Sequence, residues 1–206
     1  KAEEVALFVR QDSEKYVSKF HKIKNGKLTW NWSAFVFAPY WFFYRKMHKI
    51  GVVFLALSLL LSVGFSLLPP VQRLYSDLTE WSTKYSVENL NEMSEEEIIT
   101  ASNESLALMR ENNTGMLLVF SQTALSFGLQ FLAGVMGNKW YCNYTLKKVK
   151  QIKEKEKDER NRKLLLLQQG GTSVGSFFLA VFANNMIVMA IEMLLMTVET
   201  LFTNIK

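Results

Sequence analysis

The stretch IGVVFLALSLLLSVGFSLL, residues 50–68, contains no Asp, Glu, Lys or Arg. Two further stretches share this property, residues 115–138 and residues 164–191. An α-helix needs about 20 mostly apolar residues to cross the hydrocarbon core of a bilayer, so each stretch is long enough to span it. The sequence therefore predicts an all-α integral membrane protein, a helical bundle with three transmembrane helices.

The segments that flank these stretches differ in charge. Residues 1–50 carry ten Lys and Arg and residues 137–170 carry ten, whereas residues 69–114 carry three together with nine acids. Because Lys- and Arg-rich loops stay in the cytoplasm, we expect a multi-pass protein of the plasma membrane with its N-terminus cytoplasmic and its C-terminus external. The net charge of +5 is then mostly an orientation signal, with attraction to anionic lipid headgroups as a further contribution, and it does not indicate nucleic-acid binding.

Seven segments are expected along the chain. They are a cytoplasmic amphipathic helix in residues 1–29, an aromatic re-entrant or interfacial segment in 30–47, a first transmembrane helix in 48–68, an acidic external helical hairpin in 69–114, a second transmembrane helix in 115–137, a basic cytoplasmic helical segment in 138–170, and a third transmembrane helix with a short external C-terminus in 171–206.

The first two segments contain local helix signals. Asp12 or Ser13 is suited to cap a helix that ends at Asn25-Gly26. Asn31 can cap a short helix, and Pro39 cannot continue it, so we expect a new helix from Tyr40 that runs on into the first transmembrane stretch. Aromatic and basic side chains in this segment are typical of residues that anchor a protein at the membrane interface. The expected anchors are Asn31, Trp32, Trp41, Tyr44, Arg45 and Lys46.

Three motifs resemble a known family. They are NWSAFVFAPYWFFYRKM in residues 31–47, GNKWYCNYTLKKVKQIK in residues 137–153 and GGTS in residues 170–173. Together they resemble the signature of a bacterial membrane family catalogued as domain of unknown function 2628. The resemblance implies a multi-pass membrane protein and brings no established activity, and the acidic connector in residues 69–114 has no counterpart in it.

The two connectors that follow the first span are predicted to be helical hairpins. In the external one, apolar residues recur at helical spacing after Pro69-Pro70, and Ser94 with Glu97 forms a capping box that opens a second helix, with the joint near residues 89–91. In the basic one, the second span continues as a mixed-charge helix, the chain reverses near residues 158–161, and Thr172 or Ser173 caps the next helix.

Each predicted transmembrane helix also has a polar face, which in lipid marks the side where helices meet. The faces are Ser58, Ser62 and Ser66 in the first helix, Gln122, Ser126 and Gln130 in the second, and Asn185, Glu192 and Glu199 in the third. A carboxylate inside the bilayer costs about 2.5–3.5 kcal/mol, so Glu192 is expected to face the protein interior beside an amide such as Gln122 or Asn185. Two interpretations remain open, a hydrogen bond between helices and a proton or cation site.

The sequence does not favour an enzyme. His21 and His48 are the only histidines, Cys142 is the only cysteine, and no phosphate-binding glycine loop or nucleophile motif occurs. No catalytic, cofactor-binding or metal-binding residue is therefore expected. The favoured hypothesis is a non-enzymatic subunit that forms a homo-oligomer or joins another membrane subunit. The alternatives are a cation or proton channel or transporter formed between copies, and a lipid-binding protein.

Overall fold

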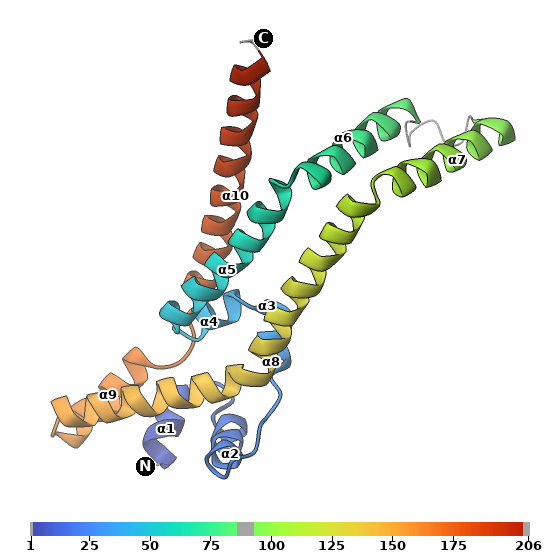
Figure 1. The fold of residues 1–206 in the computed structure, drawn as a ribbon. Coiled ribbons are helices and arrows are strands. Elements are labelled where there is room, and N and C mark those ends of the chain that lie inside the picture. Colours follow the sequence, from blue (N-terminus) through green and yellow to red (C-terminus); the bar gives the residue numbers. More distant parts are fainter. Residues whose placement is uncertain (1, 86–92, 204–206) are drawn as a thin grey trace. The chain divides into compact units, whose positions relative to one another are not determined.

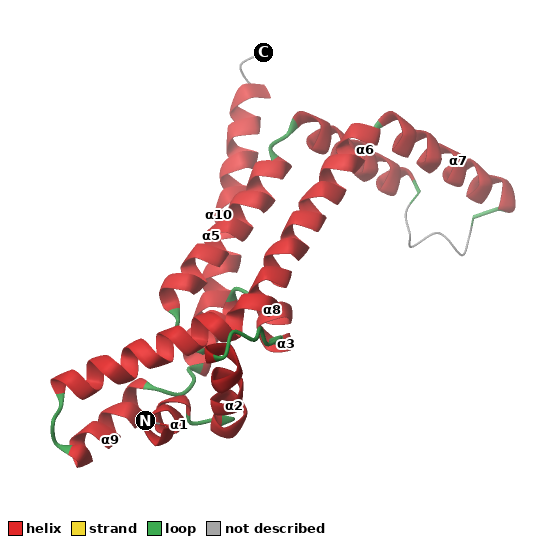
Figure 2. Ribbon diagram, turned by 60° about the horizontal axis from the view of Figure 1, so that its bottom comes forward, coloured by secondary structure: helices red, strands yellow, loops and turns green. Residues whose placement is uncertain are grey.

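The computed structural model describes residues 2–85 and 93–203, and this part of the chain is helical throughout, without strands (Figures 1 and 2). The predicted all-α class is therefore confirmed. The chain divides into two compact units, one formed by residues 1–57 and 128–206 and the other by residues 58–127. Helices α5 and α8 contribute to both units. The described helices are α1 (Ala2–Val9), α2 (Ser13–Lys24), α3 (Trp32–Phe37), α4 (Tyr40–Tyr44), α5 (His48–Ser66), α6 (Pro69–Lys84), α7 (Glu95–Glu111), α8 (Asn113–Lys155), α9 (Glu159–Gln169) and α10 (Val174–Thr203).

Three described stretches are long and apolar enough to cross a membrane, His48–Ser66, Asn113–Lys155 and Glu159–Leu195. The third comprises α9 and part of α10, and its uncharged part is residues 164–191. Few of their apolar side chains are buried within the chain, and many are exposed, as Leu60 at 69 % and Leu179 at 67 % illustrate. The predicted number of long apolar helices is therefore confirmed.

The first unit begins with two short helices that pack on each other. Helix α2 is the predicted amphipathic helix, with Tyr16 and Phe20 buried, and Gly26 ends it in the left-handed conformation at φ 77°. The residue before α2, Asp12, makes no side-chain capping hydrogen bond, so capping does not define this helix start. One helix was expected in residues 1–29, and the structure has a second one, α1. An eight-residue helix is stable only through packing, which here buries Val5, Phe8 and Val9.

The aromatic segment folds as two short helices, α3 and α4. As predicted, Asn31 caps α3, since its side chain accepts a hydrogen bond from the Ala34 amide at 3.0 Å. The expected continuous helix from Tyr40 into the first apolar stretch is wrong. Helix α4 ends at Tyr44, and Lys46 adopts a left-handed conformation at φ 59°, which no α-helix accommodates. Helix α5 therefore begins separately at His48.

The basic segment forms the predicted hairpin, in which α8 runs to Lys155 and α9 returns alongside its end (Figure 2). Asp158 caps α9 by accepting a hydrogen bond from the Asn161 amide at 2.8 Å. At the other end of α9, Lys46 Nζ donates to the Gly170 carbonyl at 2.6 Å, so a cation compensates the helix C-terminus. Ser173 then caps α10 through the Ser176 amide at 3.2 Å, as the sequence predicted.

The second unit contains the helical hairpin that was predicted for residues 69–114. The predicted capping box of Ser94 and Glu97 is confirmed at the start of α7, while the expected joint at residues 89–91 lies outside the described residues. Helices α6 and α7 are tied by the Lys84–Glu104 ion pair at 2.8 Å and by Trp81 Nε1, which donates to the Ala101 carbonyl at 3.1 Å. Val71, Leu74 and Ala101 are buried, whereas four apolar side chains of α7 remain exposed, Ile98, Ile99, Leu106 and Met109.

Candidate functional site

A buried amide pair fixes the aromatic segment on helix α8. Asn31 Nδ2 donates to Asn138 Oδ1 at 2.9 Å, and Asn138 Nδ2 donates to the carbonyl oxygens of Thr29 at 3.1 Å and Trp30 at 3.0 Å. Asn138 is fully buried and Asn31 is 3 % exposed. Two of the motifs noted in the sequence, residues 31–47 and 137–153, therefore meet through one asparagine from each.

Two glycines of α8, Gly134 and Gly137, let the aromatic segment pack close to this helix. A Cβ atom at Gly134 would lie 2.7 Å from the Trp30 ring, and one at Gly137 would lie 2.9 Å from the Ala34 Cβ. The Asn31 amide also donates to the Gly134 carbonyl at 2.8 Å. The absence of side chains at both glycines is thus needed for this contact, which in turn positions the residues that follow Ala34.

One of these following residues, Arg45, is almost completely buried, with 4 % of its surface exposed. Its guanidinium carbon lies 4.5 Å from the Tyr16 ring centroid, 5.1 Å from that of Tyr141 and 5.6 Å from that of Tyr44. Three aromatic rings therefore surround the cation, an arrangement that stabilises a desolvated guanidinium. Its Nε and Nη1 atoms are nevertheless buried without a hydrogen-bond acceptor.

Tyr16 and Lys46 both have shifted pKa values. Burial raises the pKa of Tyr16, and the neighbouring Arg45 cation partly opposes this because it favours the phenolate. Burial also lowers the pKa of Lys46, with a further contribution from the positive charge of Arg10. Both shifts follow from charged or ionisable groups that are packed away from water.

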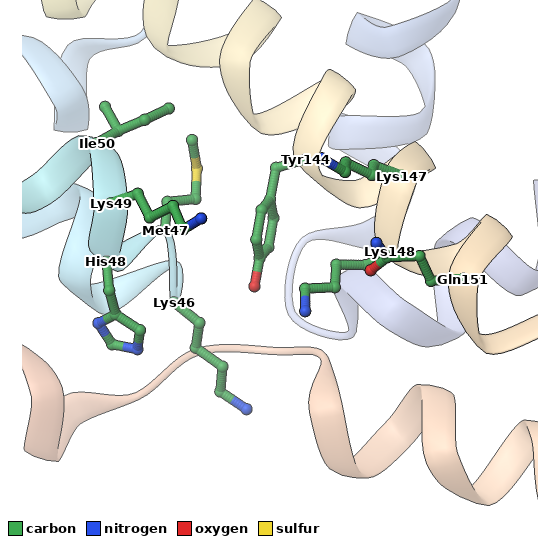
Figure 3. A pocket seen from close by; sticks show the side chains of 9 residues that line it. All are labelled: Lys46, Met47, His48, Lys49, Ile50, Tyr144, Lys147, Lys148 and Gln151. Atoms are coloured by element: carbon green, nitrogen blue, oxygen red, sulfur yellow. The ribbon is translucent and has the colours of Figure 1, made fainter. Parts of the chain in front are cut away.

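A separate pocket of about 530 Å³ lies between the start of α5 and the basic part of α8 (Figure 3). In Figure 3, the Tyr144 ring stands between the α5 side chains on the left and those of Lys148 and Gln151 on the right. No lining residue is acidic. The lining residues are Lys46, Met47, His48, Lys49, Ile50, Tyr144, Lys147, Lys148 and Gln151. We call this the basic pocket.

No carboxylate lines the basic pocket to neutralise its positive charge. Lys46 is engaged with the carbonyls at the end of α9, which leaves Lys49, Lys147 and Lys148 to face an incoming group. A lysine ammonium is a compact point charge that binds phosphate oxygens well, and a tyrosine hydroxyl donates to the same oxygens. The chemistry of the lining therefore suits an anion, with phosphate the best match.

The predicted interfacial anchors have different environments in the structure. Asn31, Trp41 and Arg45 are buried, Tyr44 and Lys46 are half-buried, and Trp32 is 70 % exposed. The buried members thus hold the fold of the first unit. Only Lys46 among the six lines the basic pocket.

The predicted polar faces have no described site built around them. Asn185 is exposed and donates to the Val181 carbonyl of its own helix at 2.8 Å. Glu192 is exposed, and the Glu199 side chain lies outside the described residues. Gln122, Ser126 and Gln130 are half-buried on α8. Within the described part of the chain, no cluster of three or more His, Cys, Asp or Glu side chains has the geometry of a metal site.

Apart from Lys46, the residues of the basic pocket were not predicted as a site. From the sequence, Lys49, Lys147 and Lys148 were interpreted as positive charges that set orientation and attract anionic lipid headgroups, and Tyr144 was not singled out. The one available signal was that both groups of lysines lie near the ends of uncharged stretches. Nothing in the sequence indicated that residues about a hundred positions apart line one pocket.

Comparison with known proteins gives a family match and no other information about function. Searches among curated proteins and among solved structures gave no match. A family model described as "Protein of unknown function (DUF2628)" matches residues 8–89, a segment that includes the motif in residues 31–47. Over residues 8–89 the chain thus matches the DUF2628 family, which confirms the family resemblance, and the motifs in residues 137–153 and 170–173 lie outside the matched segment.

Proposed function

We propose that this chain is a multi-pass membrane protein that binds the headgroups of anionic phospholipids in the basic pocket. Support for membrane insertion comes from the long apolar helices, whose outward side chains include Leu60, Leu179 and Phe182 at more than 60 % exposure. Leaving such surface in water costs about 25 cal/mol per Å² of apolar area. A bilayer removes that cost along the whole length of each helix.

The expected orientation puts the basic pocket at the inner membrane surface. Lys49 directly precedes the uncharged stretch that begins at Ile50, and Lys139 follows the one that ends at Asn138. Tyr144, Lys147 and Lys148 follow Lys139 within about three helical turns, at 5.4 Å per turn. The pocket is then at the level of lipid phosphates, where lysines are attracted to anionic lipid.

The observation that carries the proposal is the acid-free lining of a pocket with four lysines. A pocket of about 530 Å³ is large enough for a phosphate with its glycerol, since pockets for small molecules run from about 300 to 1,000 Å³. Basic pockets between membrane helices on the cytoplasmic side are suited to acidic lipid headgroups. Phosphatidylglycerol and cardiolipin satisfy this chemistry.

Native mass spectrometry of the protein in neutral detergent tests the proposal, with phosphatidylglycerol, cardiolipin and phosphatidylcholine compared as ligands. The variant carries Lys147→Gln and Lys148→Gln, and the control carries Lys150→Gln, an exposed lysine of the same helix that does not line the pocket. At about 1 kcal/mol for each lysine, the double variant should lose roughly 30-fold in affinity for the acidic lipids. Equal affinities of variant and control, or equal binding of phosphatidylcholine, would contradict the proposal.

A second candidate function is that of a subunit in an oligomer or larger membrane complex. It is favoured by the exposure of Asn185 and Glu192 among apolar side chains of α10, because a polar group that faces lipid is unfavourable unless a neighbouring protein satisfies it. Light scattering of the solubilised protein should then report an oligomer that Glu192→Leu weakens. A strictly monomeric wild-type particle would count against this candidate.

The channel or transporter alternative rests on the same side chain. Liposomes containing the protein would then conduct cations or protons, and Glu192→Gln would abolish the flux. Intact oligomers without flux would exclude that alternative and leave the subunit.

A further inference from the structure

A second cavity, of about 440 Å³, lies in the first unit and has two chemically distinct ends. Tyr16, Tyr44 and Arg45 form a polar end, and Phe37, Trp41 and Phe178 belong to an aromatic wall. None of its lining residues lines the basic pocket. We call it the arginine cavity.

The polar end contains an arginine with unused donors. Arg45 is 4 % exposed, and its Nε and Nη1 atoms have no acceptor. Among the described residues no carboxylate forms an ion pair with it. Buried donors of a charged group are costly to leave unpaired, and the three tyrosine rings around the cation offset that cost only in part. Both atoms are enclosed in the structure, so an anion reaches them when the Tyr16 and Tyr44 side chains that line the cavity with Arg45 move aside.

The charges around the cavity indicate how much negative charge it suits. Its charged lining residues are Arg45, Lys15 and Asp12, of which the last two are exposed. Their sum is a single positive charge. A ligand with one negative charge neutralises it, whereas a group with two negative charges would leave an excess.

The aromatic wall indicates what the rest of the ligand is. Phe178 is 62 % exposed and Phe37 is 53 % exposed, so the cavity opens along apolar rings. An acyl chain that covers this wall removes apolar surface from water, which is favourable, whereas a fully hydrated inorganic ion makes no such favourable contact with it. The combination of buried cation and apolar exit therefore selects an amphiphile.

We propose that the arginine cavity binds the anionic head of one amphiphile, a carboxylate or a phosphodiester, with its apolar chain lying along Phe37, Trp41 and Phe178. A guanidinium presents paired donors to two oxygens of such a head, which a lysine cannot do. The cavity is thus a binding site separate from the basic pocket, and it does not depend on the proposed function of that pocket.

The experiment is a titration of the protein in neutral maltoside micelles, followed by native mass spectrometry. Oleate probes the carboxylate and phosphatidylglycerol probes the phosphodiester. Arg45→Gln should weaken binding by about tenfold or more, and Arg45→Lys, which keeps the charge and loses the paired donors, should also weaken it. Binding of either probe with this response supports the site and identifies the kind of head it takes.

If the Arg45 variants do not fold, a matched pair of surface variants still tests the proposal. Phe178→Ala should weaken binding by about fivefold, since it removes wall area, whereas Phe182→Ala, one turn along α10 and equally exposed at 64 %, should not. Failure of both probes to bind, or equal affinity of the two phenylalanine variants, would overturn the proposal. A loss of oleate binding in the Lys147→Gln/Lys148→Gln variant would assign oleate binding to the basic pocket and would also overturn the proposal.

Discussion

Replacing Asn138 by alanine removes the hydrogen bonds that hold the aromatic segment on α8. The side chain accepts from Asn31 Nδ2 at 2.9 Å and donates to Thr29 Oγ1 and to the carbonyls of Thr29 and Trp30 at 3.0–3.1 Å. Asn138 is fully buried, so water does not substitute for the lost partners. The variant keeps the helix, because alanine has the highest helix propensity, and it therefore isolates the tertiary contribution.

The expected loss follows from these contacts. About three effective hydrogen bonds at about 1 kcal/mol each, together with at least 1 kcal/mol for the unpaired Asn31 donor, give about 4 kcal/mol of unfolding free energy. For a chain of this size, each kcal/mol lowers Tm by about 2–4 °C, so Asn138→Ala should unfold roughly 8–16 °C below the wild type. Tryptophan fluorescence during heating in neutral detergent measures this.

The control is Asn143→Ala, an exposed asparagine on the same helix, which should change the unfolding free energy by less than about 0.5 kcal/mol. A double-mutant cycle with Asn31→Ala adds a second check, because the two effects should not be additive when the side chains contact each other. An Asn138→Ala shift no larger than that of Asn143→Ala would refute the reasoning.

Two further predictions concern the same unit. Gly137→Ala introduces a Cβ 2.9 Å from the Ala34 Cβ and should destabilise the protein by about 1–3 kcal/mol. Gly128→Ala lies on the same helix, its new Cβ meets no atom within 4 Å, and it should stabilise the protein by about 0.5–1 kcal/mol. Thermal unfolding that ranks the two variants in the opposite order would be inconsistent with the close contact at Gly137. Burial raises the pKa of Tyr16 above 10.0, so its contribution to stability is complete below pH 10 and declines as the pH rises through the raised pKa. As the pH rises above 10, the unfolding free energy of Tyr16→Phe should therefore fall less than that of the wild type. Equal decreases of the two unfolding free energies in an alkaline titration would contradict a raised pKa of Tyr16.

Features set by local chemistry were predictable from the sequence. The long uncharged stretches, the Asn31 cap, and the capping box of Ser94 and Glu97 each depend on residues within one or a few turns, and the structure confirms them. The break between α4 and α5 was not predictable in this way. It depends on the left-handed Lys46, whose ammonium bonds the distant end of α9, and a helical pattern gives no sign of that contact.

The candidate sites depend on long-range contacts and were therefore harder to predict. Asn31 and Asn138 were both noted within motifs, but their hydrogen bond joins residues 107 positions apart. Arg45 was expected to reach the lipid surface, as exposed arginines do, and is instead enclosed by tyrosines from three helices. Composition does not distinguish a snorkelling arginine from a buried one, because the difference lies in which aromatic residues pack around it.

Cysteine labelling in intact cells tests the membrane arrangement most directly. Native Cys142 is 1 % exposed and gives little background, so a cysteine introduced at exposed Ser102 or exposed Lys150 reports its own location. With a membrane-impermeant maleimide, Ser102→Cys should be labelled in intact cells, and Lys150→Cys only after the cells are permeabilised. Labelling of Lys150→Cys in intact cells, or protection of Ser102→Cys, would contradict a basic pocket at the inner membrane surface.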